Sequence, residues 1–230
     1  MFADLTFAFH GARRARVYAS PRAGQRGGGA PLLLLFDGQN IFDDAGSYAG
    51  GWQAHAAVGA LPGTIDVPIV VAIDNGGHTR IEELWRGLDG LLDAIRGDLL
   101  PAVRARWAVR PGPVAIGGSS LGGLAALAAH LRHPDTFGAA ICISPSFWFD
   151  NGAIFREVPA RPAPGARVYL DVGLRESPRM VAGAQRMVGH LQAHGYDATR
   201  LLWRPDARGT HRERHWQRRL PKALRFVFRR

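Results

Sequence analysis

Apolar residues along the chain gather in five short runs, each of a length expected for a β-strand buried on both faces. The runs cover residues 32–36, 69–73, 114–116, 139–143 and 168–172. Ahead of them, residues 4–10 and 14–19 alternate apolar and polar side chains on either side of Gly11, which is the pattern of a β-hairpin. Residues 199–203 are also strand-like, so the sequence predicts about eight strands.

The segments between these runs repeat their apolar residues with the period of a helix. They are residues 81–107, 121–131, 180–194 and 213–228. Strands that alternate with helices indicate an α/β fold, with a mostly parallel central sheet and helices on both faces. Residues 146–165 contain three prolines and form the least regular stretch, so we expect a small cap or none.

Length and composition describe an ordinary globular protein. The 230 residues, 47% hydrophobic and 21% charged, suffice for one sizeable core, so we predict a single domain over residues 1–230. The one cysteine, Cys142, excludes a disulfide within the chain. The first ten residues lack a basic segment followed by a long apolar one, and no apolar stretch is long enough to cross a bilayer. We therefore expect a cytoplasmic protein without a membrane partner.

The formal net charge of +10 would suit a nucleic-acid surface. Of the 29 basic residues, however, 28 are arginine and only Lys222 is lysine, which resembles a codon bias more than a selected binding face. We therefore expect no nucleic-acid partner, and the composition leaves the oligomeric state open.

The strongest local motif lies at residues 113–123, where a strand leads into G-x-S-x-G and an alanine-rich helix. Only Ser120 has a glycine two residues away on both sides, at Gly118 and Gly122. This pattern is typical of the sharp strand-to-helix turn that carries the nucleophile of α/β-hydrolases, and a glycine-rich structural turn is the alternative. The free N–H groups of the following helix favour an oxyanion, with Leu121 as the natural donor. We predict an α/β-hydrolase fold with Ser120 as the nucleophile.

A serine hydroxyl needs a neighbouring base, so a histidine must come from another loop. In α/β-hydrolases the acid and then the histidine follow the serine along the chain. His211 fits this order, because it follows residues 199–203 and a loop, just before the last predicted helix. His215 is its rival. Four other histidines after Ser120 lie in predicted helices or at their ends, where a solvated or capping role suffices: His130, His133, His190 and His194.

His211 and His215 are four residues apart, a spacing that would also allow a shared metal ion on a helix. The zinc-binding pattern requires Glu directly after the first histidine, and here Arg212 occupies that position. We therefore predict neither a metal nor a cofactor.

A carboxylate must orient the imidazole and stabilise its charged form. Asp171 lies within the strand predicted at residues 168–172, whereas Glu176 follows Gly173 in the loop beyond it. A side chain in that loop can turn toward His211, so we predict Glu176 as the acid. Asp171 and Asp206 are alternatives, and a surface ion pair is the structural interpretation of Glu176.

Six segments in the same order resemble one family of esterases. They are residues 35–42, Gly51 with Trp52, the Ser120 turn, residues 144–148, residues 171–176, and His211 to Glu213 with Trp216. The family includes enterochelin esterases, S-formylglutathione hydrolases, feruloyl esterases and the mycobacterial antigen 85 mycolyltransferases. Several members carry an additional N-terminal domain or long insertions that these 230 residues lack, so we expect a small, open pocket.

The resemblance implies a catalytic triad of Ser120, Glu176 and His211. It also implies an oxyanion hole formed by the backbone N–H groups of Gln39 and Leu121. Trp52 and Trp148 would line the substrate pocket, although simple core packing explains two tryptophans as well. Some enterochelin esterase relatives use a serine and a histidine alone, so the acid is the part of the triad that the resemblance fixes least.

These observations predict a serine carboxylic-ester hydrolase that works through an acyl-enzyme on a small or anionic, siderophore-like ester. One alternative is an acyltransferase with the same triad. A second is a non-catalytic scaffold that binds a partner or nucleic acid through the arginine-rich C-terminal helix, residues 212–230.

Overall fold

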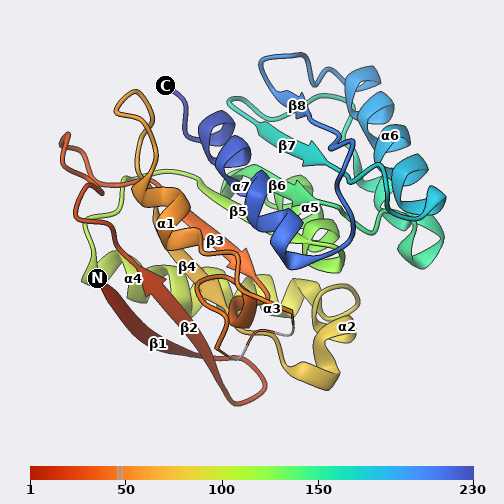
Figure 1. The fold of residues 1–230 in the computed structure, drawn as a ribbon. Coiled ribbons are helices and arrows are strands. Elements are labelled where there is room, and N and C mark those ends of the chain that lie inside the picture. Colours follow the sequence, from red (N-terminus) through yellow and green to blue (C-terminus); the bar gives the residue numbers. More distant parts are fainter. Residues whose placement is uncertain (46, 48) are drawn as a thin grey trace.

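The computed structural model of the protein (Figure 1) describes residues 1–45, 47 and 49–230. Its centre is an eight-stranded sheet with the strand order β1-β2-β4-β3-β5-β6-β7-β8. The strands are β1 (Phe2–Ala8), β2 (Ala12–Tyr18), β3 (Leu32–Phe36), β4 (Ile69–Ile73), β5 (Val114–Ser119), β6 (Phe137–Ile143), β7 (Arg167–Asp171) and β8 (Leu201–Trp203). The β1–β2 and β2–β4 pairs are antiparallel, and all other pairs are parallel. The predicted α/β fold with a mostly parallel sheet of about eight strands is confirmed.

The central strands are buried on both faces, as their continuous apolar character requires. Every residue of β3 and β4 is buried, and their bounds are those that the sequence predicts. β5 and β6 are longer than predicted, because both continue through glycines that a hydrophobic pattern does not register, at Gly117, Gly118 and Gly138.

Two layers of helices cover the sheet. On one face α1 (Ala54–Gly59) and α7 (Glu213–Val227) pack together over one core, in front of the sheet in Figure 1. The other face carries α3 (Leu88–Ala94), α4 (Leu100–Arg106), α5 (Leu121–Arg132) and α6 (Pro178–Ala193), over a larger core. The sequence pattern did not predict α1, a short helix with too few apolar positions to establish a period.

The single helix predicted over residues 81–107 is wrong. It is divided into α2 (Arg80–Glu83) and a second helical stretch that starts at Leu88, and that stretch contains a π-helical turn over Ile95–Leu99 between α3 and α4. The break falls at Gly87, where the absence of a side chain makes the helix less favourable.

Residues 146–165 pack against the core beside α5. They contain helical turns within Phe149–Glu157 that are interrupted at Asp150, Asn151 and Gly152, and Ile154 and Phe155 are buried. None of the residues 146–165, all of which the structure describes, lines the cavity beside Ser120. In the part of the chain that the structure describes, no helix combines the length and the apolar character needed to span a bilayer.

Candidate active site

The predicted triad and oxyanion residues meet at the carboxyl edge of the parallel strands, where α/β sheets commonly bind their ligands. An open cavity of about 800 Å³ lies there. It is lined by residues that follow β3, β4 and β5 and by the start of α7: Asp37, Gln39, Asn40, Ala49, Asn75, Arg80, Ser119, Ser120, His211, Arg212, Glu213 and Trp216.

Ser120 occupies a sharp turn between β5 and α5, with φ 55° and ψ −120°. The two flanking glycines are required by space. A Cβ on Gly118 would lie 2.7 Å from the carbonyl carbon of Gly122, and a Cβ on Gly122 would lie 3.0 Å from the carboxylate of Asp37. The G-x-S-x-G pattern therefore reflects close packing of the turn, which lets the serine side chain project into the cavity.

His211 joins Ser120 to a carboxylate. Its Nε2 lies 3.0 Å from Oγ of Ser120, and its Nδ1 lies 2.8 Å from Oε2 of Glu176. The His211 side chain is 38% exposed, whereas the Glu176 side chain is fully buried. The imidazole thus faces the cavity while its carboxylate partner is shielded from water.

The Glu176 carboxylate is held on its other oxygen as well. Oε1 accepts hydrogen bonds from Oγ of Ser144, over 2.5 Å, and from the backbone N–H of Gly173, over 2.8 Å. Burial raises the pKa of Glu176, but the hydrogen bonds from His211, Ser144 and Gly173 outweigh it, and the net pKa is lowered. Glu176 is therefore an ionised, fixed hydrogen-bond acceptor for His211.

The alternative acids have other partners. Asp171 is buried below the site, where its carboxylate lies 2.9 Å from Nη1 of Arg219 and accepts a hydrogen bond from the Tyr169 hydroxyl. Burial raises the pKa of Asp171 to about 6, against the opposing effect of Arg219. Asp206 pairs with Arg218 over 2.7 Å. Of the three candidate carboxylates, only Glu176 contacts His211.

His215 faces its own loop. Its Nδ1 accepts a hydrogen bond from the backbone N–H of Thr210 over 2.7 Å, and it does not contact Ser120. Among the described residues, no group of three or more His, Cys, Asp or Glu side chains is arranged to hold a metal ion. His130 lies apart from the site, buried between the Phe137 carbonyl and the Tyr196 hydroxyl.

The two predicted oxyanion donors lie at the starts of helical turns. Leu121 is the first residue of α5, and Gln39 belongs to the short 3₁₀ turn Gly38–Asn40 after β3. The first N–H groups of a helix have no partner within it, so both are available to a ligand. The Gln39 side chain is locked to Asn75: it donates to the Asn75 carbonyl over 3.0 Å and accepts from its N–H over 3.2 Å.

A buried carboxylate that the sequence analysis missed supports the Gln39 turn. Asp37 has a left-handed backbone, with φ 60°, and its carboxylate binds both Nε and Nη2 of Arg80, over 2.6 and 2.7 Å. It also accepts a hydrogen bond from the side chain of Asn75 over 2.6 Å. Asp37 follows β3, whereas Asn75 follows β4 and Arg80 begins α2, so no single local motif could have predicted the network.

The two tryptophans implied by the resemblance do not line the cavity. Trp52 is buried in the core under α7, with its ring 6.2 Å from that of Trp216. Trp148 packs on the opposite core and donates a hydrogen bond to Sδ of Met180. The structure thus places both side chains where core packing explains them.

A mostly parallel sheet between two helical layers, with a glycine-flanked serine turn at its carboxyl edge, is the α/β-hydrolase fold. Residues 8–227 match the family described as "Putative esterase", and the chain belongs to this family. The predicted family membership is confirmed.

The relatives of the chain include siderophore esterases. It is 32% identical over 165 residues to the iron(III) salmochelin esterase of Escherichia coli, a match that covers 63% of this chain and 39% of that protein. The chain thus spans well under half the length of this relative.

Solved structures share the fold over almost the whole chain. The enterobactin esterase of Shigella flexneri superposes with a TM-score of 0.80 at 22% identity, over 99% of this chain and 58% of that one. The siderophore hydrolase of Aspergillus nidulans superposes with a TM-score of 0.74 at 20% identity, over 98% of this chain and 93% of that one.

Proposed function

We propose that this protein, acting as one domain over residues 1–230, hydrolyses carboxylic esters through an acyl-enzyme on Ser120. The observation that carries the proposal is the continuous hydrogen-bonded series from Ser120 through His211 to Glu176. A hydroxyl, an imidazole and a buried carboxylate in this order are the groups that acyl transfer requires.

In the first half of the reaction, Oγ of Ser120 attacks the acyl carbon and its proton passes to Nε2 of His211. The negative charge that develops on the acyl oxygen is stabilised by the N–H groups of Gln39 and Leu121. The carbon–oxygen bond to the alcohol then breaks, and His211 gives the proton to the departing alcohol. Glu176 holds the imidazole in the required tautomer and stabilises its cation.

In the second half, water attacks the acyl carbon and His211 takes its proton. The bond between the acyl carbon and Oγ of Ser120 breaks, His211 returns the proton to Oγ, and the carboxylic acid leaves. These steps need no metal or cofactor, because the imidazole carries every proton.

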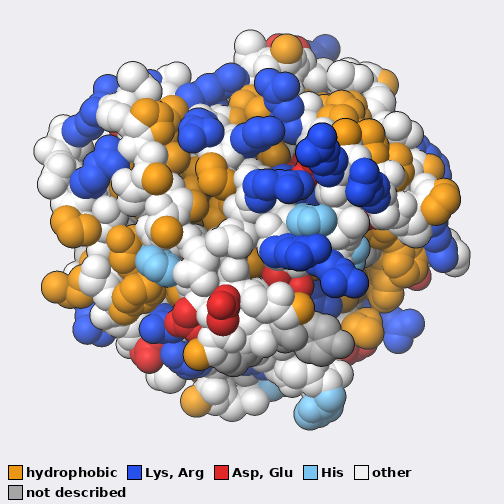
Figure 2. Space-filling view, in the orientation of Figure 1, with side chains coloured by type: hydrophobic (Ala, Val, Ile, Leu, Met, Phe, Trp, Pro, Cys, Tyr) orange, Lys and Arg blue, Asp and Glu red, His pale blue; other side chains and the backbone are white. Residues whose placement is uncertain are grey.

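The substrate class that we propose is a small or anionic, siderophore-like ester. The named relatives are esterases or hydrolases of siderophores. Lys and Arg side chains gather over α7 and the loop before it, on the face shown in Figure 2. Arg212 is exposed at the cavity, whereas the guanidinium of Arg80 is already bound by Asp37. Arg212 is therefore the cavity cation best placed to attract an anionic ester.

Turnover of p-nitrophenyl acetate by the wild type and by Ser120→Ala tests the reaction class. We expect the variant to lose at least about three orders of magnitude in kcat/KM, with an unchanged circular dichroism spectrum. Equal rates for the two proteins would refute the esterase proposal.

A second pair of variants identifies the acid. Glu176→Gln should lower kcat because the amide cannot stabilise the His211 cation, whereas Asp171→Asn should act mainly on stability. If Asp171→Asn abolishes activity while Glu176→Gln retains it, Glu176 is the wrong assignment.

A further inference from the structure

A second serine contacts the oxygen that would react. Ser146 lies just beyond β6, is buried, and has its Oγ 3.2 Å from Oγ of Ser120. Its backbone N–H donates to the carbonyl oxygen of Ser120 over 3.0 Å. The two serines are therefore joined through both backbone and side chain.

The direction of the side-chain hydrogen bond follows from the number of protons. A serine hydroxyl has one proton to donate and two lone pairs that can accept. When the Ser120 proton points to Nε2 of His211, Oγ of Ser120 can only accept from Ser146. Ser146 Oγ has no other hydrogen-bond partner among the described residues, so its proton is available for this contact.

The strength of the acceptor changes during an acyl-enzyme reaction. In the free enzyme the acceptor is a hydroxyl oxygen, and in the acyl-enzyme it is the bridging oxygen of an ester, which is a weaker acceptor. When that ester bond breaks during deacylation, Oγ takes the electron pair and becomes a much stronger acceptor. A donor that binds more strongly in the transition state than in the ground state accelerates that step.

We propose that Ser146 is a catalytic residue of deacylation, which donates a hydrogen bond to Oγ of Ser120 as that oxygen leaves the acyl carbon. The inference rests on the acyl-enzyme mechanism proposed above. During acylation the ground-state acceptor is already a hydroxyl oxygen, so the hydrogen bond strengthens less before the transition state and Ser146 assists that step less. Ser146 therefore affects the rate of deacylation more than the rate of acylation, whereas His211 serves both steps.

Stopped-flow kinetics of Ser146→Ala with p-nitrophenyl acetate test the inference. The burst of p-nitrophenol gives the acylation rate constant, and the decay of acetylated protein in intact-mass spectra gives the deacylation rate constant. We expect deacylation to slow about 10- to 100-fold, with acylation within about 3-fold of the wild type. Because deacylation then limits turnover, kcat and KM should fall together while kcat/KM stays nearly constant.

Two further variants separate a catalytic role from a structural one. Ser146→Thr keeps the hydroxyl and should restore most of the deacylation rate. Ser20→Ala removes another buried hydroxyl, one that accepts a hydrogen bond from the backbone N–H of Arg22 far from the site, and should leave both rate constants unchanged.

Each contrary outcome has its own meaning. Equal losses in both rate constants of Ser146→Ala would make Ser146 a structural support of the Ser120 turn. An unchanged deacylation rate, or a threonine variant as slow as the alanine variant, would remove it from the reaction. If the wild type forms no acetyl-enzyme, the proposed function itself fails, and the Ser120→Ala comparison detects this independently.

Discussion

The arginines at the two edges of the sheet bind different partners. At the carboxyl edge, Arg219, Arg80 and Arg13 bind carboxylates with low exposure. At the amino edge, Arg22 and Arg167 bind backbone carbonyl oxygens. Arginine side chains thus hold carboxylates at the edge of the candidate site, and they hold backbone carbonyl groups at the opposite edge.

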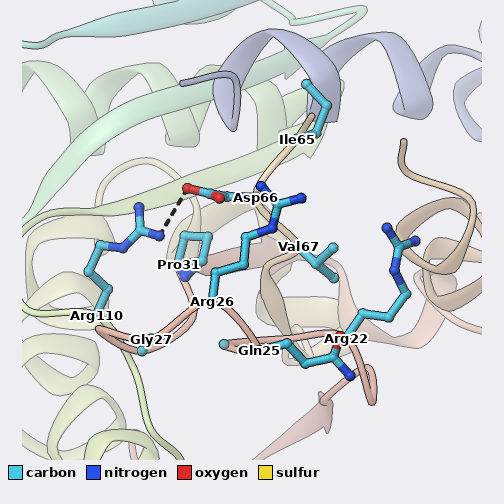
Figure 3. Close-up of a pocket in the computed structure, with 11 residues that line it drawn as sticks. Arg22, Gln25, Arg26, Gly27, Pro31, Ile65, Asp66, Val67 and Arg110 are labelled. Atoms are coloured by element: carbon cyan, nitrogen blue, oxygen red, sulfur yellow. Dashed lines mark hydrogen bonds and ion pairs between the residues drawn. The ribbon is translucent and has the colours of Figure 1, made fainter. Parts of the chain in front are cut away.

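Figure 3 shows part of the amino edge, where the side chains of Arg22 and Arg26 extend from the loop after β2. Arg22 donates to the carbonyls of Gly59 and Leu61, over 2.9 and 2.8 Å, and Arg26 donates to that of Gly63. These carbonyls lie at and beyond the end of α1, where helix carbonyl groups lack partners within the helix.

Arg167, at the start of β7, makes the same kind of contact with the carbonyls of Val227 and Arg229 at the end of α7. Two pockets lie at the amino edge, and Asp66 is the one acidic side chain among the described residues that line them. A carbonyl partner satisfies hydrogen bonds and leaves the guanidinium charge uncompensated. Part of the net charge of +10 therefore belongs to arginines that bind backbone carbonyl oxygens within the fold. The charge alone does not indicate a polyanionic ligand.

The largest effect that distinguishes the two edges should come from Arg219→Met. It leaves the buried carboxylate of Asp171 without its cation, and we expect a loss of about 3–5 kcal/mol in the free energy of unfolding. Arg167→Met should cost about 1–3 kcal/mol, as for hydrogen bonds made by a charged donor. Urea unfolding at pH 7 measures both, and adding Asp171→Asn should recover part of the larger loss. Equal losses of unfolding free energy in Arg219→Met and Arg167→Met would contradict the distinction between the two edges.

Arg80→Met should separate activity from stability. The loss of its two hydrogen bonds frees Asp37 and the turn that carries Gln39, so we expect kcat/KM to fall about 10- to 100-fold. A neutral ester such as p-nitrophenyl acetate excludes loss of charge attraction as the cause. Arg22→Met is the matched control: it should lower the free energy of unfolding and leave kcat/KM unchanged. A fall in activity for both variants would indicate general unfolding.

Acid should affect the carboxyl edge selectively. Hydrogen bonds from Arg13 are the main cause that lowers the pKa of buried Glu83 from 4.5 to about 2. The unfolded chain therefore takes up the proton first, so this pair stabilises the fold fully above pH 4.5 and loses its contribution as pH falls toward 2. The stability difference between the wild type and Glu83→Gln should narrow over that range in urea titrations. The difference for Arg22→Met should stay constant, because no carboxylate takes part.

The smallest effect should come from Arg110→Ala. Arg110 pairs with Asp66 over 2.9 Å, but its side chain is 47% exposed, and Asp66 also contacts Arg230. We expect a cost below about 1 kcal/mol that shrinks further in 1 M salt. A cost that is larger, or independent of salt, would contradict the description of this pair as a solvent-screened contact.

The sequence predicted elements whose cause is local. Strands buried on both faces leave continuous apolar runs, so β3 and β4 have the predicted bounds. The serine turn is equally local, because the glycines that make room for it lie within two residues of Ser120. The predictions of His211 as the base and Glu176 as the acid follow from the order of elements along an α/β-hydrolase chain.

What the sequence did not predict depends on contacts between distant segments. Asp37 lies 38 residues before Asn75 and 43 before Arg80, and it meets them only when the fold brings the two segments together. Ser146 lies in residues 144–148, a segment that resembles the esterase family, but the sequence assigned it no role. Its contact with Ser120 arises only when β6 lies beside β5. The tryptophans were assigned by resemblance, which carries no information on which side of a strand or helix a side chain faces.

The backbone at Ser120 has one more consequence. Its combination of φ 55° and ψ −120° is open to glycine but costs a residue with a side chain on the order of 1–3 kcal/mol. A glycine at this position would relieve that strain and remove the hydroxyl in a single step. Stability and the proposed reaction therefore make opposite demands on one residue, and a chain selected only to stay folded would have little reason to keep a serine there.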